Sequence, residues 1–223
     1  MDALYGRYIR PGDLAFDIGS HVGDRISAFR RLGARVVALE PQPGPASVIR
    51  VFHGRDRKVT CLRSAAGSAP GELVLRVNSR NPTVSSLSAD FISAAQDARG
   101  WEGQDWDQSL AVPVTTLDLL IAEHGVPSFI KIDVEGFEEE VLAGLTQAVP
   151  ALSFEFTTIA RDAARACLTR LERLGPYRFN VALGESQVLS FGEAIPVGQM
   201  WDFIASLPDE ANSGDVYAEL PRG

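Results

Sequence analysis

Cysteine is scarce in this sequence: the 223 residues include only Cys61 and Cys167, which lie far apart and outside any metal-ligand or CxxC spacing. This usage excludes a disulfide-rich scaffold and fits two reduced thiols in a cytoplasmic protein. Long hydrophobic runs are also missing: no stretch approaches the roughly 18 apolar residues of a membrane span, and residues 1–13 have no apolar signal-peptide core. We therefore expect a cytoplasmic protein with no membrane partner.

Positive charge is the second shortage. Lys and Arg number 21 against 29 Asp and Glu, which gives a formal net charge of −8 at pH 7. This negative net charge disfavours nonspecific binding to nucleic-acid phosphates, so we expect no nucleic-acid partner. Four arginines nevertheless lie close together, namely Arg25, Arg30, Arg31 and Arg35. We interpret them as the solvated face of a helix, with binding of an anionic substrate as the alternative.

What the sequence does contain is typical of a globular α/β domain. It is 45% hydrophobic and 22% charged, and its length suits a single domain over residues 1–223. From Asp13 onward, short apolar runs alternate with helical spacing, the pattern of βα units around a mainly parallel sheet. The expected strands are residues 13–19, 35–41, 58–66, 71–78, 128–134, 151–156 and 215–220. The expected helices are residues 24–33, 44–54, 115–125, 136–145, 160–175 and 200–206.

Two regions need separate interpretation. Residues 177–183 and 186–191 have strand character, and we predict that they pair as an antiparallel hairpin near the C-terminus. Between residues 78 and 113 the periodicity weakens into a polar stretch that carries Trp101 and Trp106. We predict a lid or substrate loop there; the alternative is that the tryptophans only anchor a long loop to the domain.

The most specific local pattern is FDIGSHVG, a strand followed by Asp17, Gly19, three residues, Gly23 and a helix. Glycine is needed where the backbone turns sharply and lets a ligand come close, and the next helix offers unpaired N–H groups at its start. We predict a nucleotide-type cofactor cleft at the carboxyl edge of the sheet.

The spacing of the glycines narrows the cofactor. The run Gly19-Ser20-His21-Val22-Gly23 lacks the middle glycine of G-x-G-x-x-G, which admits a pyrophosphate. Glu40 ends the second strand 21 residues after Gly19, where it could accept hydrogen bonds from both hydroxyls of a ribose. A nucleoside without a pyrophosphate fits best, and S-adenosylmethionine is the common one. An NAD-type oxidoreductase of related architecture is the alternative.

The sequence resembles the FkbM-type S-adenosylmethionine-dependent methyltransferases. The resemblance rests on FDIGSHVG, VVALEPQP, AAG at 65–67, SSL at 85–87, VTTLDLL, and above all FIKIDVEGFEEEVLAGL followed by LSFEF. These segments follow in order over roughly two thirds of the chain. The C-terminal third matches only in general layout.

The resemblance implies a class I methyltransferase (Rossmann-like) fold with a seven-stranded, mostly parallel sheet and helices on both faces. It also implies methyl transfer, usually to a hydroxyl oxygen of a sugar, polyketide or other small metabolite. Family members usually have asparagine at the position of His21. By this resemblance, Asp17, Gly19 and Gly23 would hold the methionine part of the cofactor. Glu40 would hold its ribose, and the turn at Ala66 would lie near the adenine. The full predicted cofactor-binding set is Asp17, Gly19, Ser20, His21, Gly23, Glu40, Pro41, Ala66 and Asp133.

The segment FIKIDVEGFEEE carries the predicted chemistry. Asp133 ends the expected strand, where side chains face the cleft, and it is our first choice for the general base. Glu135 and His21 are the other predicted catalytic residues. Lys131 lies inside the strand and must be paired, with Asp17, Asp133 or Glu155 as the expected partner. Glu138, Glu139 and Glu140 fall in a first helical turn, where negative charge is stabilising, so we interpret them as mostly structural.

Two further possibilities complete the predictions. Acids that meet at a cleft can bind Mg²⁺, but nothing in the spacing fixes such a geometry and His21, His53 and His124 are not at ligand spacing, so no metal site is predicted. A methyltransferase fold kept as a noncatalytic binding module is the alternative from another class of function. The expected partner is a small-molecule hydroxyl acceptor.

Overall fold

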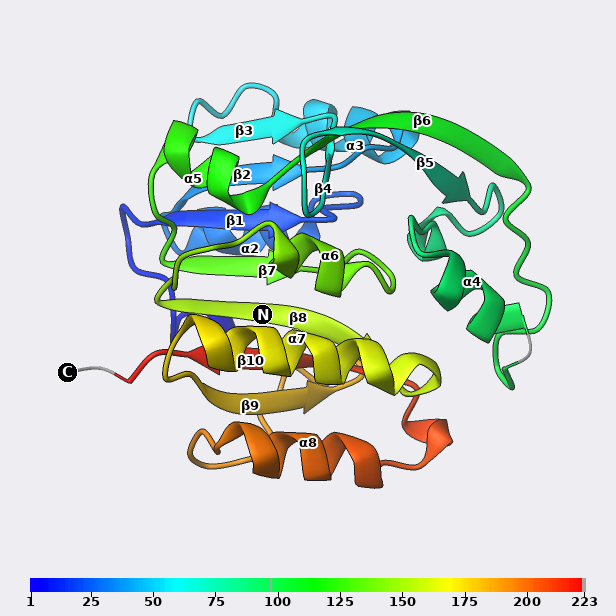
Figure 1. Cartoon of the computed structure of the whole chain (residues 1–223). Helices are drawn as coiled ribbons and strands as arrows, with labels where there is room; N and C mark the ends of the chain where they lie inside the picture. The colour runs from blue at the N-terminus through cyan, green and yellow to red at the C-terminus, as the bar shows by residue number, and fades with distance from the viewer. Residues whose placement is uncertain (97, 222–223) are drawn as a thin grey trace.

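The computed structural model describes residues 1–96 and 98–221. Its centre is a seven-stranded sheet in the order β3-β2-β1-β7-β8-β10-β9 (Figure 1). The strands are β3 (Val59–Leu62), β2 (Arg35–Leu39), β1 (Leu14–Ile18), β7 (Phe129–Ile132), β8 (Ala151–Thr157), β10 (Ser213–Glu219) and β9 (Arg178–Leu183). The pairs from β3 to β8 are parallel, and β10 runs antiparallel to both β8 and β9. The predicted fold class is confirmed.

Helices cover both faces of this sheet, because its central strands are buried on both sides. One face packs against α1 (Asp2–Tyr5), α2 (Asp24–Arg31) and α3 (Pro43–His53). The other packs against α5 (Leu117–His124), α6 (Glu138–Ala143), α7 (Arg161–Leu174) and α8 (Val197–Ser206). Thr116 caps α5 as the sequence predicts, since its side chain accepts a hydrogen bond from the Leu119 N–H at 3.1 Å.

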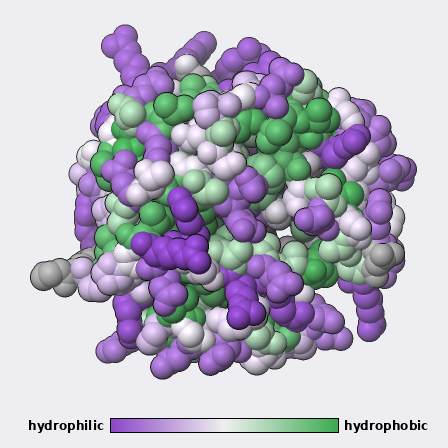
Figure 2. Space-filling model, in the orientation of Figure 1, coloured by the Kyte–Doolittle hydropathy of each residue, from purple (hydrophilic) through white to green (hydrophobic). Residues whose placement is uncertain are grey.

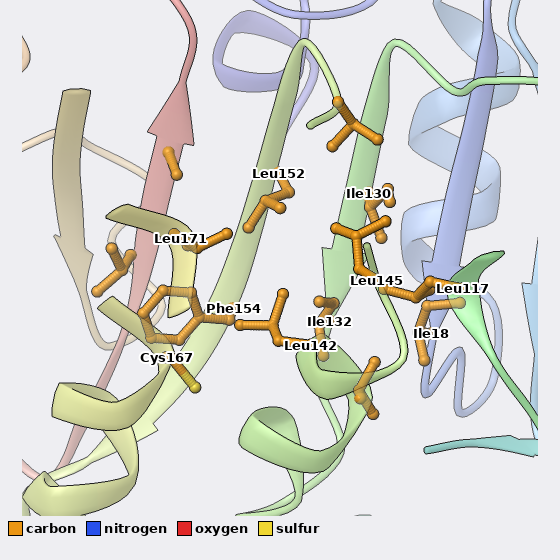
Figure 3. Packing of buried hydrophobic residues seen from close by; sticks show 14 of the residues in the cluster. Ile18, Leu117, Ile130, Ile132, Leu142, Leu145, Leu152, Phe154, Cys167 and Leu171 are labelled. Atoms are coloured by element: carbon orange, nitrogen blue, oxygen red, sulfur yellow. The ribbon is translucent and has the colours of Figure 1, made fainter. Parts of the chain in front are cut away.

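The larger core lies between the sheet and the second group of helices. Figure 3 shows Ile18, Ile132 and Phe154 from three neighbouring strands meeting Leu142 of α6 and Leu171 of α7. All five side chains are at most 1% exposed. Burial of each such side chain stabilises the fold by about 1.5–3 kcal/mol, so this layer holds the carboxyl ends of the strands in place.

A second, three-stranded sheet was not expected. It contains β4 (Ala65–Ala66), β6 (Gln108–Thr115) and β5 (Gly71–Val77), in that order. Residues 58–66, predicted as one strand, are therefore divided between two sheets. Residues 71–77 form the predicted strand, but it pairs with β6, whose polar start and Pro113 hide its alternation in the sequence.

The predicted loop at 78–113 consequently contains regular structure. It includes a 3-10 turn (Pro82–Val84), α4 (Ala89–Gln96) and most of β6, while residue 97 lies outside the described residues. Trp106 donates a hydrogen bond from Nε1 to the Val84 carbonyl at 2.8 Å, and the ring of Trp101 lies edge-on to Phe91 at 5.3 Å between centroids. Both tryptophans thus anchor this segment, and its role as a lid stays a prediction.

The predicted C-terminal hairpin is wrong in one respect. Residues 186–191 form no strand, and the antiparallel partner of β9 is β10. Asn180 explains the difference, because its side-chain amide donates to the Phe191 carbonyl at 2.7 Å and its Oδ1 accepts from the Phe191 N–H at 3.1 Å. These bonds hold the segment beside β9 without a strand ladder.

Within residues 1–96 and 98–221, no helix is both long enough and apolar enough to cross a bilayer.

Candidate active site

A pocket lies where β1, β2 and β7 end, at the carboxyl edge of the sheet. Gly19 begins the turn after β1 with φ +87°, and a Cβ atom there would lie 1.8 Å from the Asp133 carbonyl oxygen. Only glycine permits this close approach of two strand ends. Gly23 also has a positive φ, +92°, and precedes α2 as its N-cap.

Most of the predicted residues meet in this pocket. Its lining includes Asp17, Gly19, Ser20, His21, Glu40, Pro41, Ala66, Asp133 and Glu135. Gly23 is not among the lining residues: the nearest atoms to a Cβ placed there belong to Ile26, Ile49 and His53. The role that the structure supports for Gly23 is to shape the start of α2.

Several lining residues were not predicted as part of the site. They are Asp24, Gln42, Ser64, Leu75, Pro82, Thr83, Phe137 and Glu185, together with neighbours in sequence of the predicted set. Arg25, Ser85, Leu87 and Glu155, which the sequence had singled out without placing them in this pocket, line it as well. Those between Leu75 and Leu87 come from the second sheet and its following loop, so no sequence pattern placed them here. The SSL motif was the one available signal.

The arginine cluster was predicted to be the solvated face of a helix, and this prediction is wrong for Arg25. Its side chain is 25% exposed and lines the pocket, with Nη2 3.9 Å from Asp133 Oδ2. Arg30 instead pairs with Asp56, and Arg31 pairs with Asp2 at the surface. The position of Arg25 in the first turn after the glycine loop is the signal that could have singled it out.

Glu40 lies at the end of β2 and is 3% exposed. Its Oε2 accepts a hydrogen bond from the His21 N–H at 2.9 Å, and its Oε1 accepts one from the Gln42 N–H at 2.8 Å. Burial raises the pKa of Glu40 to about 7, although these two backbone bonds act in the opposite direction. Each oxygen keeps a further lone pair, so the carboxylate can still bind two hydroxyl groups.

His21 has the left-handed backbone conformation, with φ +46°. Asparagine and histidine are both enriched in that region, so histidine can replace the family's usual asparagine without changing the turn. The conformation points the His21 N–H toward Glu40. The observed contribution of His21 is therefore a backbone bond, in addition to a side chain that lines the pocket.

Asp17 is 1% exposed, and its Oδ2 has no hydrogen-bond partner within the described residues. Burial raises its pKa to about 6. A buried carboxylate oxygen without a partner is costly, and a ligand that donates a hydrogen bond to it, such as an ammonium group, would remove that cost.

Lys131 is fully buried and bonded by two carboxylates. Its Nζ lies 2.5 Å from Asp215 Oδ1 and 3.1 Å from Asp133 Oδ2. The expected partner Asp133 is confirmed, while Asp215 was missed because it comes from β10, 84 residues further along the chain. Burial acts to raise the pKa of Asp133, but the charges of Lys131 and Arg25 outweigh it and hold that pKa below its usual value.

Two glutamates complete an acidic group beside Asp133. Asp133, Glu135 and Glu155 each place a carboxylate oxygen within 4.8 Å of the others. Burial, followed by the charge of Asp133, raises the pKa of both Glu135 and Glu155 well above the usual value. Three carboxylates at this spacing could hold a metal ion, although Lys131 already pairs with Asp133. The absence of a metal site therefore stays a prediction from the sequence.

The neighbouring Glu138 has a structural role. It is 3% exposed, and its Oε1 accepts hydrogen bonds from the N–H groups of Val134 and Gly136 at 3.1 and 3.3 Å. It therefore holds the turn in which Glu135 adopts φ +54°. Glu139 and Glu140 are exposed in the first turn of α6, as expected.

Comparison with solved structures defines the fold. The fold is that of class I S-adenosylmethionine-dependent methyltransferases. A precorrin-6y C5,15-methyltransferase from Geobacter metallireducens matches 98% of this chain and 85% of its own with a TM-score of 0.50 at 14% identity. A putative rRNA-methylase from Clostridium thermocellum matches 100% and 94%, also with a TM-score of 0.50, at 8% identity. At these identities the likeness concerns the fold alone.

Sequence comparison then gives the family. The family model described as the methyltransferase FkbM domain matches residues 17–175, and the chain belongs to this family. Membership implies S-adenosylmethionine as the cosubstrate. The 31-O-demethyl-FK506 methyltransferase FkbM of Streptomyces tacrolimicus is 30% identical over 168 residues, which is 65% of this chain and 64% of that protein. The hexuronic acid methyltransferase AglP of Haloferax volcanii is 30% identical over 152 residues, 66% of this chain and 56% of that protein. The matches thus span less than two thirds of either relative.

Proposed function

We propose that this protein transfers a methyl group from S-adenosylmethionine to a hydroxyl oxygen of a small molecule. The observation that carries the proposal is a pocket beside Asp133 in which Glu40, the Gly19 turn and Asp17 Oδ2 converge. That oxygen has no hydrogen-bond partner within the described residues. Family membership supports it, and so do the names of the two relatives, whose acceptors are a demethylated FK506 and a hexuronic acid.

The residues of the pocket fit the parts of this cosubstrate. Glu40 would accept hydrogen bonds from the ribose hydroxyls, and the apolar Leu75, Leu87 and Ala66 would flank the adenine. Asp17 Oδ2 would accept a hydrogen bond from the ammonium of the methionine part, which satisfies the oxygen that otherwise lacks a partner. Pro41 and Ser20 shape the same wall.

The acids beyond this site suit the handling of a proton. When bound, S-adenosylmethionine supplies a methyl group activated by its sulfonium. The chain's task is to hold the acceptor oxygen in line and to take its proton as the C–O bond forms and the C–S bond breaks. Asp133, kept charged by Lys131 and Arg25, is a weak base but a fixed negative charge next to a cation. Glu135, whose pKa is raised, is better matched to accept the proton near neutral pH.

The ribose assignment is tested with Glu40→Ala. We expect the affinity for S-adenosylhomocysteine, measured by isothermal titration calorimetry, to fall by about 10- to 100-fold, because hydrogen bonds to a charged group contribute about 1.5–3 kcal/mol. Glu172→Ala on the exposed side of α7 is the matched control and should bind normally. Unchanged affinity in Glu40→Ala would refute the assignment.

The two earlier alternatives can be weighed against this pocket. The second turn glycine of a dinucleotide site is absent from the Gly19 loop. A noncatalytic module would need neither the buried Lys131 pair nor the acids beside it. Neither alternative accounts for the converging carboxylates as well as methyl transfer does.

A further inference from the structure

Arg25 brings an unpaired hydrogen-bond donor to the cofactor pocket. Its Nε is buried and has no hydrogen-bond partner within the described part of the chain. Its Nη2 lies 3.9 Å from Asp133 Oδ2, which is beyond hydrogen-bond distance. A guanidinium stays charged in a protein and presents five N–H donors, so the approach to Asp133 leaves Nε able to donate to a second group. Burying such a donor without an acceptor is costly, and a ligand that accepts from it would remove the cost.

Asp17 brings the opposite deficiency to the same pocket. Its side chain is 1% exposed, and its Oδ2 accepts no hydrogen bond within residues 1–96 and 98–221. Burial raises the pKa of Asp17 to about 6, while a hydrogen bond from Ser20 and the charge of Arg25 act against that rise. Asp17 and Arg25 therefore lie within electrostatic reach of each other. The pocket thus holds a buried acceptor without a donor and a buried donor without an acceptor.

The other basic groups of this region are committed or lie elsewhere. Within the described residues the pocket is lined by two basic side chains, those of Arg25 and His21, and His21 lies in the turn beside Glu40. Lys131 is already bonded by Asp133 and by a second carboxylate. Because the strands are ordered β2-β1-β7, Glu40 at the end of β2 and Asp133 after β7 mark opposite ends of the pocket. A ligand whose ribose is held at Glu40 therefore extends past the end of β1 toward Arg25.

Arg25 reaches the pocket from the face of the sheet that packs against α1, α2 and α3. Figure 2 views the molecule from the opposite face, where the surface is hollowed between the region of α4 and that of α6 and α7. Within residues 1–96 and 98–221, Arg25 lines the pocket but not this hollow. The guanidinium thus lies on the side of the pocket away from the hollow, close to Asp133.

From these contacts we infer that Arg25 binds the carboxylate of the methionine part of the cosubstrate, while Asp17 binds the ammonium on the same carbon. The inference rests on the proposed methyltransferase function and adds a residue to its binding site. An α-amino acid carries both charged groups side by side, so one ligand satisfies both unpaired atoms. Charge-assisted hydrogen bonds from arginine to a carboxylate are among the strong ones. Gly23, the N-cap of α2, has no side chain to occupy the start of the helix, whose dipole adds to the attraction.

The inference is tested by isothermal titration calorimetry with two ligands: S-adenosylhomocysteine and its decarboxylated analogue, which keeps the ammonium. In Arg25→Met we expect the affinity for S-adenosylhomocysteine to fall by about 10- to 100-fold and that for the analogue by less than about threefold. Arg35→Met is the matched control and should bind both ligands as the wild type does, because Arg35 is exposed at the start of β2, the end of that strand away from the pocket. An equal loss for both ligands, or no loss for either, overturns the inference.

A second measurement uses the wild-type protein, so it does not depend on the folding of Arg25→Met. The Nε–H resonance of Arg25, assigned by its absence from the spectrum of Arg25→Lys, should shift on addition of S-adenosylhomocysteine and stay in place with the decarboxylated analogue. A resonance that responds equally to both ligands, or to neither, contradicts a bond between Nε and the carboxylate.

The acceptor is the other source from which a carboxylate could reach Arg25. A hexuronic acid and its primary amide serve as the probes. If Arg25→Met binds S-adenosylhomocysteine normally but transfers methyl at least about tenfold more slowly to the acid relative to the amide, the carboxylate belongs to the acceptor and the inference is overturned. The methyltransferase proposal stands in that case. If the wild type does not bind S-adenosylhomocysteine, the proposed function fails and the inference fails with it.

Discussion

Lys131 shows how one buried cation sets the protonation of several acids. It is fully buried, yet Asp215 and Asp133 bond it from two different strands. A buried ion pair of this kind contributes little net stability, but removing one partner leaves a charge whose burial costs several kcal/mol. The pair keeps Asp133 ionised, and the charge of Asp133 in turn raises the pKa values of Glu135 and Glu155. Lys131 thus favours the charged form of Asp133, and the charge of Asp133 favours the protonated form of the two glutamates.

This division of roles predicts the effect of Glu135→Gln. We expect kcat to fall by about 10²- to 10⁴-fold, the usual contribution of a general base, with little change in affinity for S-adenosylhomocysteine. The wild-type kcat should rise with pH, with a midpoint above the ordinary glutamate pKa, because the base must be deprotonated, and this rise should vanish in the variant. Glu123→Gln, an exposed change on α5, should keep both rate and profile. Full turnover with an unaltered pH profile would exclude Glu135 and return the role to Asp133.

At the scale of elements, the site depends on the unit formed by β1, the Gly19 turn and α2. The turn passes so close to the end of β7 that the two strands fix each other's carboxyl ends. A second contact of the same kind joins α4 to the turn after β7: a Cβ on Gly136 would lie 2.5 Å from Phe91 Cβ. Two glycine contacts therefore fix the turns after β1 and β7, one within the main sheet and one to the segment after β5.

The first of these contacts predicts the result of Gly19→Ala. The new Cβ would clash with the Asp133 carbonyl oxygen and the backbone would be strained at φ +87°, so we expect the free energy of unfolding to fall by more than about 2 kcal/mol. Binding of S-adenosylhomocysteine should be lost as well. Gly198→Ala in α8, where a Cβ meets nothing within 4 Å, is the control and should leave stability unchanged or slightly raised. Urea unfolding measures both, and equal midpoints for the two variants would contradict the contact.

At the scale of the whole molecule, the large cores around the main sheet are separate from the small core of the second sheet, which forms one wall of the pocket. The two helical layers bury the main sheet, and the carboxyl ends of its strands β1, β2 and β7 line the pocket. The second sheet, with its own small core of Ala65, Leu75, Val112 and Val114, stands beyond those ends and supplies the far wall of the pocket. A substitution in the second sheet can therefore change the wall of the pocket without disturbing the larger core.

A ligand-induced change in thermal stability tests the molecule as a unit. A compound that binds only the folded state at 100 times its Kd stabilises by about 2.7 kcal/mol, which raises the Tm by several degrees for a chain of this size. We expect this shift with S-adenosylhomocysteine and none with NAD at the same concentration, measured by differential scanning fluorimetry. The opposite ranking would favour the oxidoreductase alternative.

The sequence by itself determined the parts that depend on neighbouring residues. Short apolar runs predicted the central strands, and the glycine spacing predicted the turn after β1. The position of Glu40 at a strand end followed from the second of these runs. The KIDVEG segment indicated where the acids lie, because parallel strands present their carboxyl ends at one edge.

Only the tertiary structure decided which distant residues meet. Asp215 reaches Lys131 because β10 inserts antiparallel between β8 and β9, and β6 pairs with β5 although Pro113 and polar residues obscure its pattern. The presence of Arg25, Glu155 and Glu185 in one pocket likewise depends on which elements pack together. Local periodicity gives the identity of an element, whereas the charge and shape of a cleft arise from surfaces that become neighbours only when the chain folds.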